Sequence, residues 1–145
     1  MKCVILAGGS GKRFSEQTVY MPKPMIEVCG KPIILHIIDT YIKYNISEFI
    51  ICAGYKYKII DEYFKNKLNI KNYKKYENIK IKVVNTGLKT MTAGRIKKIK
   101  KYIDNDENFL LTYGDGLCNF NIHNLKRIHN RDNNIVTLTA VNPIA

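Results

Sequence analysis

The sequence lacks several features that would assign the protein to a class at once. Its cysteines contain no C-x-x-C pair, which argues against a zinc site and against a disulfide framework. The apolar run after Lys2 is short and passes at once into glycine and charge, unlike a signal peptide. No apolar run approaches the length of a membrane span, and no repeat or linker divides the 145 residues. We therefore expect one globular, cytoplasmic domain without a membrane partner, whose four thiols are reduced: Cys3, Cys29, Cys52 and Cys118.

Acidic residues are also scarce. The chain has 12 Asp and Glu against 24 Lys and Arg, a formal net charge of +12, so an anionic partner is expected. Much of the lysine is spread through segments 71–77 and 97–101, which is typical of solvated surface, and no recognised nucleic-acid module accompanies the charge. We do not expect a dedicated nucleic-acid function, although the mixture of Tyr73 and Tyr76 with lysines keeps that alternative open.

Short apolar runs that are typical of buried strands alternate with segments of helical spacing. This alternation predicts an α/β, Rossmann-like fold with a mostly parallel sheet and helices on both faces. The expected strands cover 3–7, 49–53, 81–84, 109–113 and 135–141, with a further short strand at 25–28. The expected helices cover 32–44, 56–67, 90–103 and 122–131, and segment 68–80 is interpreted as a surface excursion.

A glycine-rich, basic turn follows the first predicted strand. Gly8, Gly9 and Gly11 lack the side chains that would keep an anion away from backbone N–H groups, and Lys12 and Arg13 add two positive charges. This combination favours a phosphate-binding loop, with an ordinary tight turn as the alternative.

Two common nucleotide motifs do not fit this turn. A Walker A loop would need glycine at Leu6 and a hydroxyl residue at Arg13. A dinucleotide fingerprint would need glycine at Phe14.

Two further strand-end or loop positions carry isolated charges. Pro22 and Pro24 fix the backbone on either side of Lys23, so its side chain is presented from a stiff loop. Asp115 lies between two glycines after the run 109–113, where open α/β sheets bind ligands, and it suits a hard divalent metal that bridges phosphates. A surface lysine and a turn aspartate are the plain alternatives.

The remaining candidates are weaker. A threonine cap and small residues open the helix predicted after Thr90, which favours close approach of a ligand or simply caps the helix. His36 is interpreted as packed or exposed, and His123 and His129 as exposed.

Together these motifs resemble the sugar-phosphate nucleotidyltransferase family. Residues 6–13 with 22–24 are similar to its N-terminal signature, with Lys12 in place of a threonine. Segments 49–56, 86–95 and 112–116 resemble its cytidylyltransferase branch. The resemblance extends over nearly the whole chain apart from the surface excursion.

The resemblance implies transfer of a cytidylyl group from CTP to a sugar 1-phosphate, expected to be glucose 1-phosphate, in polysaccharide biosynthesis. It implies Mg²⁺ as cofactor, held by Asp115, and Arg13 and Lys23 as catalytic residues. It also implies that Thr92, Gly94 and Arg95 help to select the base. The nucleotide-binding residues implied in this way are Leu6, Ala7, Gly8, Gly9, Gly11, Lys12, Arg13, Thr92, Gly94, Arg95 and Asp115.

The chain departs from the family after the segment 135–141. Members of the family continue with elements that close the sugar pocket, supply a second metal-binding aspartate and make much of the subunit contact. We therefore expect residues 1–145 to be the N-terminal, nucleotide-binding part of a truncated member. The alternatives are an inactive nucleotide-binding or assembly module and an enzyme that uses another nucleoside triphosphate.

Overall fold

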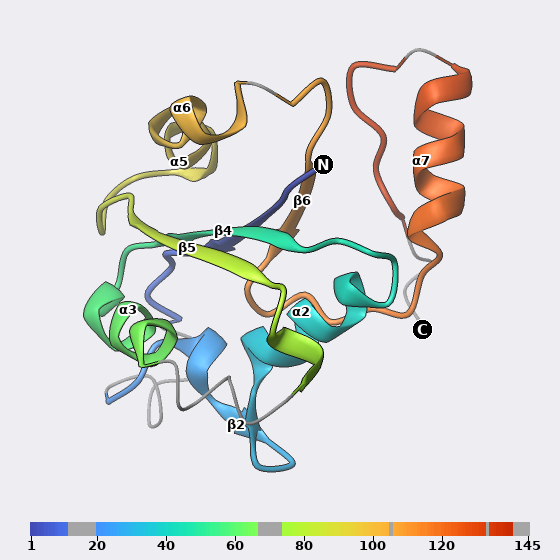
Figure 1. Ribbon diagram of the computed structural model, residues 1–145. Coiled ribbons are helices and arrows are strands. Elements are labelled where there is room, and N and C mark those ends of the chain that lie inside the picture. The colour runs from blue at the N-terminus through green and yellow to red at the C-terminus, as the bar shows by residue number, and fades with distance from the viewer. Residues whose placement is uncertain (12–19, 67–73, 105, 133, 141–145) are drawn as a thin grey trace, which may run out of the picture.

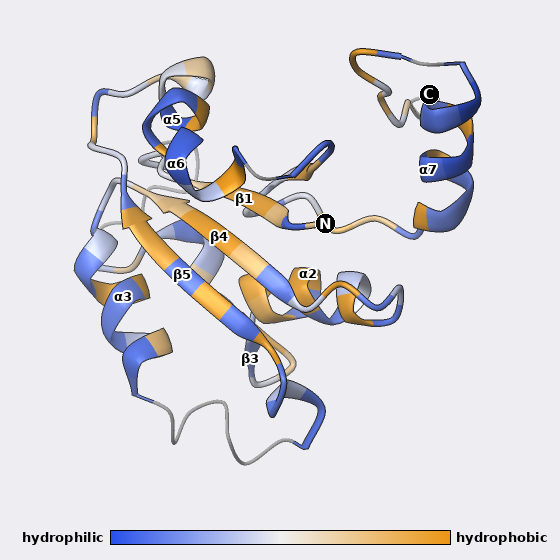
Figure 2. Cartoon of the chain, turned by 45° about the horizontal axis from the view of Figure 1, so that its top comes forward, coloured by the Kyte–Doolittle hydropathy of each residue, from blue (hydrophilic) through white to orange (hydrophobic). Residues whose placement is uncertain are grey.

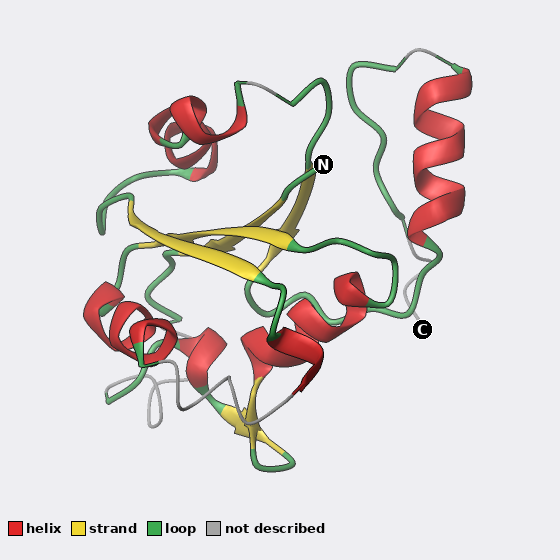
Figure 3. Ribbon diagram, in the orientation of Figure 1, coloured by secondary structure: helices red, strands yellow, loops and turns green. Residues whose placement is uncertain are grey.

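The centre of the molecule is a four-stranded sheet in which all neighbouring strands are parallel (Figures 1 and 3). The computed structural model describes residues 1–11, 20–66, 74–104, 106–132 and 134–140. The strands are β1 (Cys3–Ala7), β4 (Glu48–Ala53), β5 (Lys80–Asn85) and β6 (Leu110–Tyr113), in the order β5-β4-β1-β6. The apolar runs at 3–7, 49–53, 81–84 and 109–113 thus predicted these four strands to within one residue at either end.

The two middle strands of the sheet, β4 and β1, are buried on both faces because they are apolar at successive positions. Cys3, Ile5 and Ala7 point into one core cluster, and Val4 and Leu6 point into the other. All five side chains are buried, and β1 lies between β4 and β6 in the sheet. In Figure 2 β1 and β4 are largely hydrophobic, β5 alternates between hydrophobic and hydrophilic residues, and α3, α6 and α7 carry many hydrophilic residues.

Helices cover both faces of the sheet, as predicted (Figure 1). α2 (Ile33–Ile42) and α3 (Tyr57–Lys65) pack on one face, and α5 (Thr92–Lys98) and α6 (Lys100–Ile103) pack on the other. The amphipathic spacing of α2 buries five of its side chains: Ile34, Leu35, Ile37, Ile38 and Tyr41. A fully buried aliphatic side chain of this kind contributes about 1.5–3 kcal/mol relative to an exposed one.

A small hairpin connects the first strand to α2. Its strands are β2 (Glu27–Val28) and β3 (Lys31–Pro32), and its two-residue turn is Cys29-Gly30. Both turn residues have positive φ, 52° and 70°, as tight hairpin turns require. The hairpin follows the 3-10 helix η1 (Lys23–Met25), whose Met25 is anchored in the core.

The interpretation of 68–80 as a surface excursion is wrong for its last part. The 3-10 helix η2 (Lys74–Tyr76) packs against the body of the protein, and the Tyr76 ring is buried. The Tyr76 hydroxyl and Lys75 both donate to the Asp39 carboxylate on α2, which also accepts from Lys31. The local sequence, which is rich in lysine, could not predict this contact, because the partner carboxylate lies 36 residues earlier in the chain.

The prediction of a fifth strand at 135–141 is also wrong for its described part. α7 (Ile122–Arg131) forms as predicted, but residues 134–140 form no strand after it. Ile135 is 97% exposed and Leu138 is 82% exposed, so neither a pairing strand nor a helix covers them. An apolar run becomes a buried strand only when such partners are present.

Two local expectations are corrected as well. His129 is half-buried rather than exposed, because its ring nitrogens bond to the Thr137 hydroxyl and to the Asn108 amide oxygen, each at 3.0 Å. α5 is capped by Met91 without a side-chain hydrogen bond, and Thr90 instead accepts a hydrogen bond from Lys98. His123 is exposed, as predicted.

In the described part of the chain, no helix has the length and apolar character needed to cross a membrane.

Candidate functional site

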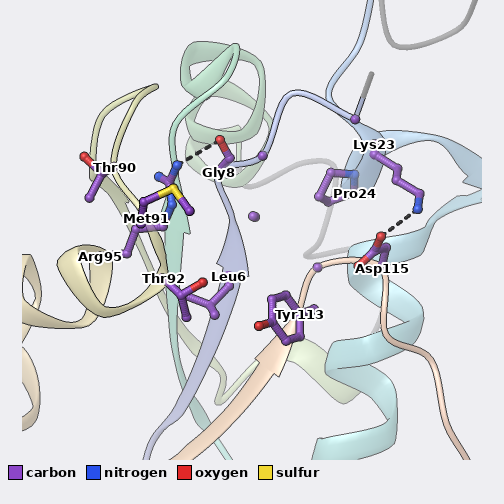
Figure 4. A pocket seen from close by; sticks show the side chains of 14 residues that line it. Leu6, Gly8, Lys23, Pro24, Thr90, Met91, Thr92, Arg95, Tyr113 and Asp115 are labelled. Carbon is purple, nitrogen blue, oxygen red and sulfur yellow. Dashed lines mark hydrogen bonds and ion pairs between the residues drawn. The ribbon is translucent and has the colours of Figure 1, made fainter. Parts of the chain in front are cut away.

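A cavity of about 280 Å³ opens at the carboxyl ends of β1 and β6 (Figure 4). This edge is where open α/β sheets bind their ligands. Its walls are the turn after β1, the helix η1, the loop that leads into α5, and the turn after β6. The lining residues are Leu6, Ala7, Gly8, Gly9, Gly11, Lys23, Pro24, Thr90, Met91, Thr92, Arg95, Tyr113, Gly114 and Asp115.

Most of the site residues that were predicted from the sequence line this cavity. The lining includes Leu6, Ala7, Gly8, Gly9, Gly11, Lys23, Thr92, Arg95 and Asp115. Among the described residues Gly94 does not line it, and a side-chain carbon there would meet the Thr90 methyl group at 2.9 Å. Lys12 and Arg13 lie outside the described residues.

Five lining residues were not among the nucleotide-binding or catalytic residues expected from the sequence: Pro24, Thr90, Met91, Tyr113 and Gly114. Each is a direct neighbour in sequence of a residue that was nominated or belongs to a motif that was noticed. Their signal was their position at a strand end or in a proline-containing loop, not their chemistry. Met91 and Tyr113 are 80% and 58% exposed, so they offer an apolar and an aromatic surface to a ligand.

The backbone of the glycine turn is fixed from one side. The Gly8 carbonyl accepts hydrogen bonds from the Tyr55 N–H at 3.2 Å and from the Arg95 guanidinium at 3.1 Å. Gly8 is required here, because a side-chain carbon would overlap that guanidinium. Gly9 is exposed, with nothing within 4 Å of the place where a side-chain carbon would stand. The turn therefore combines a fixed carbonyl with an open backbone.

Arg95 is a buried cation, only 6% exposed, at the back of the cavity. Its guanidinium donates to the carbonyl oxygens of Gly8, Ala53 and Leu88 and to the Thr86 hydroxyl. All four acceptors are uncharged. Burial lowers the pKa of Arg95 from its ordinary value, but an arginine still stays protonated in a protein.

The neighbouring Cys52 thiol lies in the same buried environment. Burial raises the pKa of Cys52 to about 11, although the positive charge of Arg95 acts in the opposite direction. Cys52 is therefore a protonated, packed thiol at neutral pH and is no candidate nucleophile.

At the opposite side of the cavity, Lys23 and Asp115 form an ion pair of 2.6 Å (Figure 4). The two side chains are 28% and 41% exposed, so water screens the pair, and it contributes about 0.2–1 kcal/mol to stability at most. Its interest is chemical. An ammonium group and a carboxylate stand together in the cavity, where the first can contact a phosphate and the second a metal ion.

Gly114 brings the two loops of this ion pair together. A side-chain carbon at Gly114 would stand 2.8 Å from Cγ of Pro24 and 3.2 Å from the Leu6 carbonyl oxygen. The absence of a side chain therefore lets the proline-flanked loop pack against the end of β6. This contact carries Lys23 to Asp115, 92 residues away in sequence.

The donor set is sparse for a metal ion. Among the described residues no three His, Cys, Asp or Glu side chains cluster at ligating distance. Among the described residues that line the cavity, Asp115 is the single carboxylate. One carboxylate fits Mg²⁺ in the way typical of nucleotide sites, where substrate phosphates and water supply the other ligands. It does not fit a metal held by the protein alone.

The sequence matches the profile of the nucleotidyl transferase family over residues 2–143. It is 41% identical to a glucose-1-phosphate cytidylyltransferase of Salmonella typhimurium, with 99% of this chain and 61% of that protein aligned. It is 42% identical to a probable glucose-1-phosphate cytidylyltransferase of Bacillus subtilis, with 100% of this chain and 62% of that protein aligned. The chain thus spans about three fifths of the length of these relatives.

The fold also matches solved structures. A UDP-glucose pyrophosphorylase in complex with UDP-glucose superimposes with a TM-score of 0.74 at 20% identity. The match covers 91% of this chain and 54% of that one, and at this identity it bears on the fold alone. The parallel sheet, the cavity at its carboxyl edge and the profile match over residues 2–143 agree, and the chain belongs to the nucleotidyl transferase family.

Proposed function

We propose that the chain is the nucleotide-binding part of a sugar-phosphate cytidylyltransferase. The observation that carries the proposal is the cavity itself. It gathers the glycine turn, Lys23, Asp115 and the loop before α5. The sequence pointed to the glycine turn for phosphate binding and to Asp115 for metal binding before the family resemblance was considered. The identity of 41–42% to glucose-1-phosphate cytidylyltransferases supports CTP as the nucleotide and glucose 1-phosphate as the acceptor.

In the proposed reaction an oxygen of the sugar phosphate attacks the α-phosphorus of CTP. The bond from that phosphorus to the bridging oxygen breaks, so CDP-sugar forms and pyrophosphate leaves. The attacking phosphate is already an anion and needs no general base. Catalysis is therefore chiefly a matter of orientation and of neutralising crowded negative charge.

The proposal gives a task to the glycine turn, to Lys23 and to the two basic residues Lys12 and Arg13. The backbone N–H groups of Gly8, Gly9 and Gly11 hold the phosphates, because no side chain keeps an anion away from them. Lys23 leaves Asp115 and places its ammonium on the charge that accumulates around the α-phosphorus. Arg13 and Lys12 are proposed, from the family resemblance, to hold the β- and γ-phosphates.

Asp115 is the residue that would hold Mg²⁺, together with the phosphates of the nucleotide. The bound ion would neutralise phosphate charge that the lysine and arginine side chains leave uncompensated. In the structure Oδ2 of the Asp115 carboxylate accepts from the Lys23 ammonium. Mg²⁺ on this carboxylate would take the place of that contact and leave the ammonium to the phosphates.

The proposal extends to the setting of the enzyme. A role in synthesis of surface-polysaccharide precursors and a location in the cytoplasm are supported by the family resemblance, and both follow only if the CTP reaction holds.

Pyrophosphate release tests the proposed reaction. The chain is incubated with CTP, Mg²⁺ and glucose 1-phosphate, and pyrophosphate is measured against parallel reactions with UTP, GTP or dTTP. Release that needs both CTP and glucose 1-phosphate supports the proposal. Release with another nucleotide only would move the chain to a different branch of the family.

The second candidate is a nucleotide-binding or assembly module that binds the nucleotide without complete catalysis. Binding of Mg·CTP without any pyrophosphate release would select this alternative.

A further inference from the structure

Arg95 occupies an unusual position for a residue expected to contact the base of a nucleotide. The four Nη hydrogens of its guanidinium are matched by four acceptors of the protein: the carbonyl oxygens of Gly8, Ala53 and Leu88 and the Thr86 hydroxyl. Among the described residues, no acceptor is assigned to its Nε–H. A ligand could claim the planar fork of Arg95 only by breaking these bonds.

These four acceptors lie on three different strand ends. Gly8 follows β1, Ala53 ends β4, and Thr86 with Leu88 follows β5. The Thr86 hydroxyl is fully buried and donates in turn to the Ala53 carbonyl at 2.7 Å. Arg95 thus links the ends of β1, β4 and β5 through hydrogen bonds, of which Figure 4 shows the bond to Gly8.

The bond to Gly8 has a consequence for the next residue. A trans peptide is planar, with its C=O and N–H pointing in opposite directions, and none of the described peptide bonds is cis. Because Arg95 and the Tyr55 N–H hold the Gly8 carbonyl on their side, the Gly9 N–H is turned to the other side. Gly9 lines the cavity and is open to an approaching group.

We propose that Arg95 is a positioning residue: it locks the Gly8–Gly9 peptide so that the Gly9 N–H points into the cavity as a ready donor to a phosphate oxygen. This inference rests on the proposed nucleotide function and adds a task for Arg95 that is independent of the base. Preorganisation of this kind raises affinity because the loop does not have to be ordered on binding.

Inorganic tripolyphosphate separates positioning from reading of the base, because it carries the phosphates alone. The test measures calorimetric binding of Mg·tripolyphosphate and of Mg·CTP at one fixed ionic strength. The variants are Arg95→Lys, which keeps the charge but loses the fork, and Thr86→Val, which removes an acceptor of Arg95 without lining the cavity. Thr86→Ser, which keeps the hydroxyl, is the matched control.

We expect Arg95→Lys to weaken both ligands about 10-fold or more and Thr86→Val to weaken both about 3- to 10-fold, in line with the loss of hydrogen bonds to a charged group. Thr86→Ser should stay within about 2-fold of the unaltered chain. If Arg95→Lys fails to fold, the Thr86 pair carries the test, since valine keeps the shape of threonine.

Two results would overturn the inference. Weaker CTP binding with unchanged tripolyphosphate binding would make Arg95 a reader of the base, and lower melting temperatures without any change in affinity would make its role purely structural. Failure of the unaltered chain to bind Mg·CTP is a different outcome. It would contradict the proposed function itself, and the inference would fall with it.

Discussion

The four cysteine thiols lie in two different environments, and this difference is measurable. Cys3 and Cys52 are fully buried, and burial raises the pKa of both thiols, that of Cys52 to about 11. Cys29 and Cys118 are exposed. Because the thiolate is the reactive form, only the exposed pair should react with a thiol reagent such as DTNB at pH 8 in the native protein.

The readout is the number of thiols released with time. We expect two to react quickly in the native state and all four in denaturant, with none fast in a Cys29→Ser/Cys118→Ser variant. Fast reaction of a third thiol without denaturant would contradict the burial of β1 or β4.

Gly114 is predicted to be essential for the approach of the Pro-Lys-Pro loop to β6. Alanine there would push against Pro24 Cγ and the Leu6 carbonyl oxygen, so we expect Gly114→Ala to lower the free energy of unfolding by about 1–3 kcal/mol. Gly116→Ala is the control, because its nearest neighbour would stand at an ordinary 3.6 Å. Urea unfolding of both variants checks this, and equal stabilities would count against the packing role.

At the scale of elements, Asp39 joins α2 to β3 and η2. Burial raises the pKa of Asp39, but hydrogen bonds from Lys31, Lys75 and Tyr76 outweigh it and hold the pKa below its ordinary value of 3.8. A folded-state pKa below the unfolded one stabilises the fold at higher pH. This stabilisation is complete above the unfolded pKa and is lost as the pH falls below 3.8 through the folded-state pKa.

Asp39→Asn should therefore cost about 1–3 kcal/mol of unfolding free energy at pH 7, since a charged acceptor of three donors is lost. The cost should shrink when unfolding is measured near pH 3. A variant deficit of the same size at both pH values would show that charge does not hold these elements together.

The elements also show how far the sequence predicts this fold. Strands β1, β4, β5 and β6 follow from apolar runs because each is paired and covered in the way that such runs require. The run at 135–141 also reads as a strand in the sequence, but its described part forms none. Its composition could not show whether a partner strand is present. The spacing of apolar residues shows which side chains a segment could bury, but it does not show whether another element packs against them.

The candidate site divides in a similar way. Gly8, Lys23 and Asp115 could be predicted as site residues because glycines, prolines and isolated charges in loops are recognisable in the local sequence. The hydrogen bonds of Arg95 and the role of Thr86 could not, because they depend on strand register and on a side chain that reaches across three loops. The same limit hid the Tyr76 contact with Asp39.

At the scale of the whole molecule, the net charge of +12 raises the question of which anionic ligand the protein binds. If it served nucleic acid, oligonucleotides would bind with strongly salt-dependent affinity and CTP would not displace them. We expect instead that any oligonucleotide binding is weak and that Mg·CTP competes for the part of it that lies at the cavity. Fluorescence anisotropy of a labelled oligonucleotide, with and without Mg·CTP at two salt concentrations, measures both quantities.

The measurement that tests the account most directly is a calorimetric titration of the folded chain with Mg·CTP, repeated with Asp115→Asn. The account predicts one site per chain and at least about 10-fold weaker binding in the variant, because a carboxylate that would hold the ion is lost. A chain that is demonstrably folded and gives no heat with Mg·CTP, or an Asp115→Asn variant that binds as tightly as the unaltered chain, would contradict it.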